Sequence, residues 1–546
     1  MFTTKKGKIL RAFNDYNYLD WLVLLFLLLI LYILNRSDSL LTQKVNVVGV
    51  IFFAIRLLGV LLPVRYVGFL FPACIVGACL IETIWGICQL CHPNKSITLF
   101  ICTGSFDNPG PYGGFLATCI CIILGIRMQF KTSVVRRLLA LTAIMALIMM
   151  ITTNSRASFL SLSVGLLVLI TQYDKYRLLI KKHCYLLLFS LVVISVFAYY
   201  IKKPSADARL FMYRIDLGIL LRSGLMGLGI GNFGGEYGLA QFRFFKERIP
   251  DIFNCINISD SFPQVKYIDC PAFAFNDFIQ LGIEGGWILL LLLLLILYLS
   301  IKRTYINKNP CCLGIISICI FALFSYPFEK TEFQILLSFL IAIGQIQSKR
   351  ILPYRKIVSY CLFFLFFAYS FFNLLPDMKK NVVSKKIWSS VSFDYESGDF
   401  GRVIDYGDRY KKYLINDFGF LFEYGNSLSK SGYYDESDSL LEIGSKKSSD
   451  PMFWNIMGNN SIAKGKYREA EERYKHAFYM LPNRLYPLYN LAKLYHIEGD
   501  TTRFLKMAEI VEAFVPKIES SKTESLRGEI RDLRTGYISE VCNNDN

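Results

Sequence analysis

The composition of this 546-residue chain excludes an ordinary soluble protein. Hydrophobic residues make up 53% of it and its mean hydropathy is +0.39, both high for a globular domain. A formal net charge of +17 would suit a nucleic-acid binder, but its distribution argues against one. Residues 1–376 hold 35 Lys+Arg against 17 Asp+Glu, whereas residues 377–546 hold 25 against 26. The excess lies in the apolar part of the chain, so we expect a membrane protein and no nucleic-acid partner.

Long apolar runs recur through the first 376 residues. A bilayer core about 30 Å thick needs about 20 apolar residues for one helix. Eleven runs come near that length, at residues 20–34, 45–62, 67–90, 113–125, 138–151, 159–170, 184–201, 287–301, 313–326, 333–346 and 357–375. No small-residue cleavage site follows the first run, which we expect to remain as an anchor. The sequence therefore predicts an all-α polytopic bundle of about eleven transmembrane helices.

Basic residues gather in alternate short loops, which predicts the orientation of the bundle. A cytoplasmic N-terminus places most of them inside: Lys5, Lys6, Lys8, Arg11, Arg127, Lys131, Arg136, Arg137, Lys175, Arg177, Lys181, Lys182, Lys302, Arg303, Lys308, Lys349, Arg350, Arg355 and Lys356. This arrangement satisfies the positive-inside bias. Eleven spans then put a long polar loop, at about residues 202–286, and all residues after 376 on the outer side.

Two short polar motifs lie at the outer ends of earlier runs. The segment 106–114 contains Asn108-Pro109-Gly110, which is typical of a turn and of the residues that cap a helix. Arg156 opens the run at 159–170, where a positive charge opposes the helix dipole. Such an arginine either reaches lipid headgroups or holds an anion at the free backbone N–H groups. We favour the anion because Ser155 and Ser158 accompany it.

The long loop adds further arginines at helical spacing. Arg209, Arg214 and Arg222 accompany an apolar series made of Leu210, Tyr213, Leu217 and Leu221. This pattern predicts an amphipathic helix on the membrane surface, and a solvated charged face is the simpler alternative. Guanidinium groups bind phosphate well, and a lipid diphosphate would lie at this depth.

A glycine-rich segment follows at residues 227–235. Its Gly229, Gly231 and Gly234 have the spacing of a dinucleotide fingerprint. No strand–helix–strand unit surrounds the segment, and it faces outward, so we reject nucleotide binding. Glycines that let the backbone approach a ligand or a helix are the better interpretation.

The order of these motifs resembles a known family. The series is Phe106-x-Asn108-Pro109, Ser155-Arg156-Ala157, Arg209, Gly227-x-Gly229-x-Gly231-Asn232-Phe233, Phe275-Asn276-x-x-x-Gln280 and Glu284-x-Gly286. It is similar to the O-antigen ligase and polymerase superfamily, which includes bacterial protein O-oligosaccharyltransferases. The resemblance implies a metal-independent enzyme without cofactors in the bacterial inner membrane. It would move a glycan from undecaprenyl diphosphate to a lipid, glycan or protein acceptor on the periplasmic side.

The resemblance also implies site residues, with one departure. Arg156, Arg209 and Arg214 would bind the diphosphate. Ligases of this family carry a histidine where this chain has Phe275, so a carboxylate would have to replace that base. The candidates for catalysis are Asn276, Asp277 and Glu284, and helix capping is the alternative role for each of the three.

The chain changes character after residue 376. Gly398, Gly432, Gly465 and Gly499 recur at intervals of 33 or 34 residues. The pattern resembles tetratricopeptide repeats, in which helix pairs stack because one pair cannot bury its apolar face alone. We therefore predict two domains, a membrane domain at 1–376 and a periplasmic repeat domain at 377–546. The repeats would bind a protein or peptide partner.

Three alternatives to the ligase or oligosaccharyltransferase remain open from the sequence. A polymerase that extends the lipid-linked glycan would use the same motifs. A transporter of amphiphiles would need charged residues buried mid-span, where only Arg56 and Glu82 are candidates, and internal inverted symmetry, of which the sequence shows no sign. A membrane-tethered repeat scaffold would need no site at all.

Overall fold

The computed structural model describes the chain apart from residues 1–4, 35–38, 62–63, 93–99, most of 173–202, and residues 250, 255–257, 259–261, 347–352 and 545–546. Within the described residues every regular element is a helix. The chain divides into two compact units. Unit 1 comprises Met1–Ile201 and Phe275–Met378, and unit 2 comprises Lys202–Ala274 and Lys379–Asn546. The sequence assigns residues 202–274 to a loop of the membrane domain, whereas in the structure this segment clusters with the C-terminal residues.

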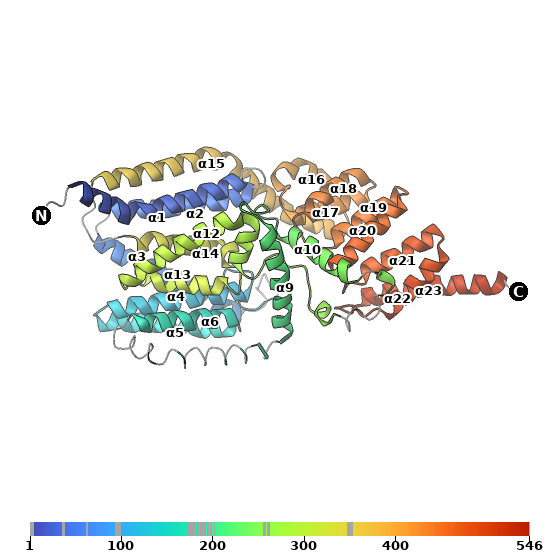
Figure 1. The fold of residues 1–546 in the computed structure, drawn as a ribbon, viewed down its shortest axis with the longest axis horizontal. Coiled ribbons are helices and arrows are strands. Elements are labelled where there is room, and N and C mark those ends of the chain that lie inside the picture. Colours follow the sequence, from blue (N-terminus) through green and yellow to red (C-terminus); the bar gives the residue numbers. More distant parts are fainter. Residues whose placement is uncertain are drawn as a thin grey trace. The chain divides into compact units, whose positions relative to one another are not determined.

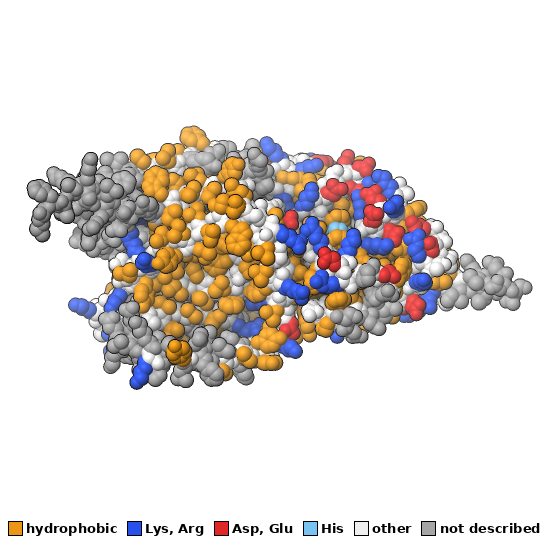
Figure 2. Space-filling model, viewed as in Figure 1, with side chains coloured by type: hydrophobic (Ala, Val, Ile, Leu, Met, Phe, Trp, Pro, Cys, Tyr) orange, Lys and Arg blue, Asp and Glu red, His pale blue; other side chains and the backbone are white. Residues whose placement is uncertain are grey.

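Unit 1 is a bundle of apolar helices that lie side by side (Figure 1). They are α1 (Lys5–Leu34), α2 (Ser39–Leu61), α3 (Val64–Cys91), α4 (Pro109–Gln129), α5 (Ser133–Thr152), α6 (Arg156–Thr171), α12 (Asp277–Ile306), α13 (Cys311–Ala322), α14 (Thr331–Gly344) and the first half of α15 (Pro353–Ser397). Hydrophobic side chains cover the face of this unit drawn in Figure 2, as contact with lipid requires.

Four helices in the described residues are long and apolar enough to cross a membrane. They are Gly68–Cys91, Pro109–Gln129, Ser133–Thr152 and Asp277–Ile306. Shorter apolar helices cover Leu19–Leu34, Val47–Gly59, Arg156–Thr171, Cys311–Ala322 and Thr331–Gly344. Each of these coincides with one predicted run. The run at 357–375 falls within α15, and the run at 184–201 lies largely outside the described residues. The bundle of apolar helices is confirmed, and the count of eleven stays a prediction.

Helix α4 occupies the centre of unit 1. It is apolar all round, and 83% of its most apolar stretch is buried, against 33% for α3 and α5. Gly114 lets α4 approach the ring of Phe321 on α13. Hydroxyl groups then link three helices, because Ser161 Oγ on α6 and Thr118 Oγ1 on α4 lie 2.7 and 3.0 Å from Ser317 Oγ on α13. Central packing therefore combines small residues with hydrogen bonds.

A buried ion pair joins α1 to α2. The Nε and Nη2 atoms of Arg56 each donate to one carboxylate oxygen of Asp20 at 2.8 Å. The two residues are only 3% and 5% exposed. Paired hydrogen bonds of this kind satisfy both charges away from water.

Unit 2 contains two helices from the long loop, α9 (Lys203–Arg222) and α10 (Phe233–Arg248), and two short 3-10 turns, η2 (Ile252–Asn254) and η3 (Pro263–Lys266). The remaining helices follow the end of α15. They are α16 (Phe400–Leu414), α17 (Phe418–Lys430), α18 (Tyr434–Ser445), α19 (Met452–Ala463), α20 (Tyr467–Met480), α21 (Tyr486–Glu498), α22 (Thr501–Ala513) and α23 (Ser521–Asn544). Each packs against the next in the chain. Charged side chains of both signs are spread over this unit (Figure 2).

The recurrent glycines mark the turns between successive helices. Gly398, Gly432, Gly465 and Gly499 have φ values of +83°, +88°, +71° and +74°. A Cβ at any of them would meet nothing within 4 Å, so the backbone conformation, not lack of space, favours glycine there. The period seen in the sequence is therefore a period of turns.

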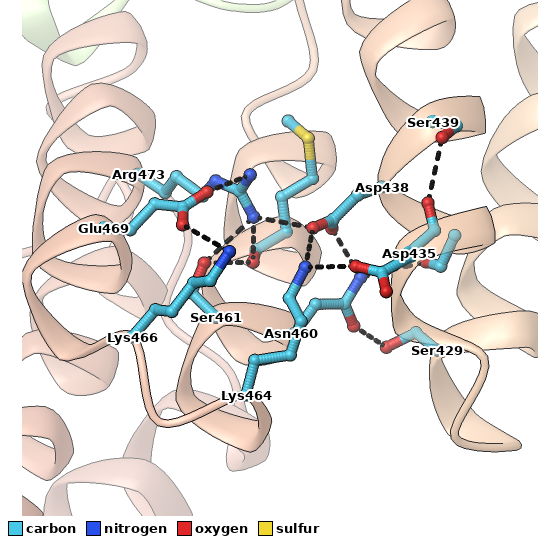
Figure 3. Close-up of polar contacts among 12 residues, drawn as sticks. Ser429, Asp435, Asp438, Ser439, Asn460, Ser461, Lys464, Lys466, Glu469 and Arg473 are labelled. Carbon is cyan, nitrogen blue, oxygen red and sulfur yellow. Dashed lines mark hydrogen bonds and ion pairs between the residues drawn. The ribbon is translucent and has the colours of Figure 1, made fainter.

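Figure 3 shows a polar network that ties α18, α19 and α20 together. Asn460 Nδ2 donates to Asp438 Oδ1 at 2.7 Å, and Lys464 Nζ donates to Asp438 Oδ2 at 2.7 Å. Arg473 Nη1 donates to the same carboxylate oxygen at 3.1 Å and also to Met457 O at 2.7 Å. A 7% exposed carboxylate with these partners fastens three helices.

Candidate functional site

The start of α4 is held by contacts from distant parts of the chain. Asn108 caps the helix, because its Oδ1 accepts the N–H of Gly110 at 2.9 Å. Asp107 accepts two hydrogen bonds from Lys330 Nζ, at 2.7 and 2.9 Å. Burial raises the pKa of the Asp107 carboxyl, but the hydrogen bond and charge of Lys330 outweigh it and lower that pKa overall. Phe106 packs against the ring of Phe333 on α14.

The start of α6 lies beside the first turn of α4. Ser155 caps α6 by accepting the N–H of Ser158, and the Ser158 hydroxyl donates to Ser155 Oγ at 2.7 Å. A Cβ at Gly113 on α4 would lie 2.5 Å from Thr153 Oγ1 and 2.9 Å from Ser158 Oγ, so these segments touch. The half-buried Arg156 is the first residue of α6, as the sequence predicts.

The start of α12 carries the predicted catalytic residues. Asn276 caps the helix, since its Oδ1 accepts the N–H groups of Phe278 and Ile279 at 3.1 and 3.2 Å. Asp277 is 3% exposed, and its Oδ2 accepts the N–H of Phe328 at 2.6 Å. Glu284, two turns further on, is 6% exposed. The capping role that the sequence offers as an alternative is therefore the observed geometry for Asn276.

Further contacts fix α12 against the turn that precedes α14. Gln280 Nε2 donates to Glu329 Oε1 at 2.7 Å. Phe275, which stands in place of the family histidine, has a φ of +50° and packs its ring edge-on against Tyr326 at 5.4 Å. The 3-10 turn η4 (Pro327–Glu329) directly precedes α14, so these contacts hold the start of α12 beside the start of α14.

These contacts gather four helix N-termini at one end of unit 1. We call this set the helix-start cluster; it comprises residues 106–113, 153–158, 275–284 and 326–333. Adjacent pairs touch through Gly113 and Ser158, through Asp107 and Lys330, and through Asp277 and Phe328. The N-terminus of a helix carries free N–H groups and a partial positive charge. Four of them, with Arg156 and Lys330, bring positive charge to a cluster that also contains the carboxylates of Asp107, Asp277, Glu284, Glu329 and Glu332.

The sequence does not predict several of the pairings at this end of the bundle. Lys330 and Gln280 are separated from their partners by 223 and 49 residues, and no local pattern pairs them. Glu82 on α3 accepts the N–H and hydroxyl of Ser105 at 3.0 and 2.6 Å. In the sequence, the position of Glu82 inside an apolar run already indicates that it has a special role. Its position next to the polar motif at 106–108 follows from the fold.

The other two predicted arginines lie in unit 2, on α9. Arg209 is half-buried, and Arg214 is exposed with its guanidinium carbon 5.4 Å from the centre of the Phe244 ring. Both are thus outside the unit that holds Arg156. That the three arginines share one diphosphate stays a prediction.

The glycine-rich segment has a structural use. Gly227, Gly229 and Gly231 have φ values of +75°, +101° and +83°, so they form the irregular turn before α10. Gly234 lies in the first turn of α10, where a Cβ would come within 2.6 Å of Lys447 O. The predicted close approach is therefore to another part of the chain.

The fold and this cluster define a class of protein, namely a multi-pass helical membrane protein with four helix N-termini gathered at a polar end. The O-antigen ligase family model matches residues 141–294, which confirms the resemblance to the O-antigen ligase superfamily. The match includes Arg156, Arg209, Asn276, Asp277 and Glu284. It implies glycosyltransferase-type activity in a membrane. No curated protein and no solved structure matches the chain.

Proposed function

We propose that the protein transfers a glycan from an undecaprenyl-diphosphate carrier to a lipid, glycan or protein acceptor on the periplasmic face of the inner membrane. The helix-start cluster is the observation that carries this proposal, because it places four helix N-termini together with Arg156. Such an environment stabilises a diphosphate, which is the leaving group of the reaction. The family match points to the same chemistry.

The reaction needs charge stabilisation and one proton acceptor. The acceptor hydroxyl attacks the anomeric carbon of the glycan, the bond from that carbon to the diphosphate oxygen breaks, and the hydroxyl proton passes to a carboxylate. Arg156 stabilises the charge on the departing diphosphate, and Arg209 and Arg214 assist from α9. Asp277 or Glu284 takes the proton, because Phe275 has no basic atom.

Asn276 has a positioning role in this scheme. Its side-chain oxygen is occupied by two backbone N–H groups of α12. It therefore orients the helix that carries Asp277 and Glu284. No step uses a metal ion, so activity is expected to persist in EDTA.

Neither charged residue that could support the transporter alternative, Arg56 or Glu82, is placed as that alternative requires. It requires charges within the spans that are available to a passing ligand. Arg56 makes a bidentate ion pair with Asp20, and Glu82 accepts two hydrogen bonds from Ser105. Both charges have a structural use in holding segments together.

A reconstituted transfer assay tests the proposal. Purified protein receives lipid-diphosphate-linked oligosaccharide from its host in the presence of EDTA, and release of free lipid diphosphate is measured. Arg156→Ala is expected to lower the rate by about 10²–10³-fold, because it removes a group that stabilises developing charge. Asp277→Asn and Glu284→Gln identify the base, whose loss is expected to cost about 10²–10⁴-fold.

Arg127→Ala is the matched control for the arginine variant. Arg127 lies in the last turn of α4, whereas the helix-start cluster contains the first turn. The control should retain the wild-type rate. Wild-type protein that is folded but releases no lipid diphosphate with any acceptor would exclude the proposed reaction.

A further inference from the structure

Helix α10 of the long loop lies directly against the helical repeats of unit 2. A Cβ at Gly235 would overlap the carbonyl oxygen of Lys446, and a Cβ at Gly238 would come within 3.0 Å of the Cα of Ser449. The obstructing atoms belong to the backbone that connects α18 to α19, so they cannot rotate away. Glycine at these positions is what permits the contact.

Aromatic stacking extends the same contact. The imidazole of His476 on α20 stacks on Phe242 of α10, with ring centroids 3.9 Å apart and planes 10° apart. It also stacks on Trp454 of α19, at 3.7 Å and 21°. Burial, with the positive charge of Lys246, lowers the pKa of His476 to about 4. The ring is therefore neutral at pH 7 and suited to lie between two aromatic faces.

Buried amides fix the rest of the loop to the repeats. Gln241 is 2% exposed, and its Nε2 donates to Met480 O at 2.6 Å. Asn483, also 2% exposed, donates through Nδ2 to Val265 O at 2.8 Å and Ile268 O at 3.0 Å. The first bond runs from the loop to the backbone of the repeats, and the other two run from the repeats to the backbone of the loop. Separating the loop from the repeats would leave both buried amide groups without these acceptors, which is costly.

A charged contact follows at the end of the loop. Lys517 Nζ donates to Ile268 O at 3.0 Å and to an oxygen of Asp269 at 2.7 Å. Burial raises the pKa of Asp269, but the hydrogen bond from Lys517 and further favourable contacts lower it overall. The paired charges therefore persist at neutral pH.

Helix α9 is held in turn by α10. Phe211 of α9 packs on Phe244 and Phe245 of α10, with ring centroids 5.3 and 5.9 Å apart. The guanidinium of Arg214 lies over the Phe244 ring. The opposite face of α9 is exposed, at Leu210, Leu217 and Leu221. The repeats thus support α10, and α10 supports the helix that carries Arg209 and Arg214.

We propose that the helical repeats are an internal support for residues 203–274 of their own chain, so that α9, with the arginines that the proposed function assigns to the donor diphosphate, is held in one conformation. The positioning residues are Gly235 and Phe242 on the loop, and His476 and Asn483 on the repeats. The catalytic part rests on the proposed function. Residues of α10 and η3 occupy this part of the repeat surface, and a protein or peptide partner stays a prediction for the rest of the repeat domain.

Hydrogen–deuterium exchange of the full chain in lipid nanodiscs, combined with the transfer assay, tests this support. Gly235→Ala forces α10 away from the α18–α19 connection, and amide exchange in α9 and α10 is expected to rise about tenfold. Gly218→Ala is the matched control, since a Cβ at this helical position of α9 meets nothing within 4 Å. Asn483→Ala removes two hydrogen bonds without a clash and is expected to act in the same direction, by about threefold.

Transfer should fall with the loss of protection in Gly235→Ala and remain at the wild-type rate in Gly218→Ala. Unchanged exchange in both Gly235→Ala and Asn483→Ala would show that the repeats do not hold the loop. Raised exchange with an unchanged transfer rate would overturn the positioning role. If wild-type protein transfers nothing, the proposed function fails, and exchange alone then decides whether the loop is held.

Discussion

Asp216 is an unusual residue in the described part of unit 2. It lies on α9, is 0% exposed, and neither carboxylate oxygen has a hydrogen-bond partner among the described residues. Burial raises its pKa well above the ordinary value. The folded state therefore binds the proton more tightly than the unfolded chain does. The stability that this provides is complete below about pH 3.9 and is lost as the pH rises toward the folded pKa.

We expect Asp216→Asn to stabilise the protein at neutral pH by about 1–3 kcal/mol, because an amide avoids the ionisation that burial opposes. Thermal unfolding between pH 4 and pH 8 measures the effect. The variant should lose less stability than wild type as the pH rises. Asp405→Asn, at an exposed position of α16, is the control and should leave the curve unchanged. Parallel curves for wild type and Asp216→Asn would contradict the assignment.

Single residues also show what the sequence can and cannot predict. Asn108 and Asn276 precede apolar runs, and each caps a helix, because capping depends on neighbours two or three residues away. The position of Arg156 at a helix start follows from the same local pattern. The pairing of Asp107 with Lys330 does not, because it depends on how α4 and α14 pack. Nor does the burial of Asp277, because it depends on a contact with Phe328, 51 residues away.

At the scale of one element, α12 is two helical segments joined at Gly286. This residue has φ +75° and ψ 177°, a backbone conformation that is strained for every residue except glycine. The first segment carries Asp277, Gln280 and Glu284, and the second is the apolar span. The sequence predicts the span from hydropathy, but the change of direction requires the structure. The kink sets the angle at which the polar segment meets η4.

We expect Gly286→Ala to destabilise the protein by about 1–3 kcal/mol and to slow transfer, because a Cβ strains this backbone and turns the first segment of α12. Gly77→Ala is the control, since it lies in a helix with nothing within 4 Å of an added Cβ. Thermal unfolding and transfer rates are compared for both. A wild-type transfer rate in Gly286→Ala would show that the kink at this residue plays no part in the reaction.

Over the full chain, the sequence predicts where the composition changes better than it predicts which distant segments are in contact. The change at residue 376 is visible in charge and in the glycine period, and both correspond to structure in unit 2. The association of residues 202–274 with the helices that follow α15 is not visible, because it depends on contacts such as Asn483 with Val265, 218 residues apart. Nothing local in either segment specifies the other.

Membrane topology can be tested on the intact chain. The positive-inside pattern predicts that the C-terminus lies in the periplasm. Alkaline phosphatase fused after Asn546 should therefore be active, and the same enzyme inserted after Phe130 should be inactive. Green fluorescent protein at these two positions should give the opposite result. Phosphatase activity only after Phe130 would show the reverse orientation. Phosphatase activity at both positions would also contradict the predicted topology.

The ion pair between Asp20 and Arg56 has a consequence for biogenesis. An arginine near the middle of an isolated helix costs about 2.5–3.5 kcal/mol to insert by translocon-based scales, and an aspartate costs a similar amount. In this protein each charge lies on a different helix of the same hairpin, and the two neutralise each other. The translocon would therefore release α1 and α2 into lipid most readily as a pair. We therefore expect α1 to leave the translocon only after the thirty-six residues that bring its counter-charge have been synthesised.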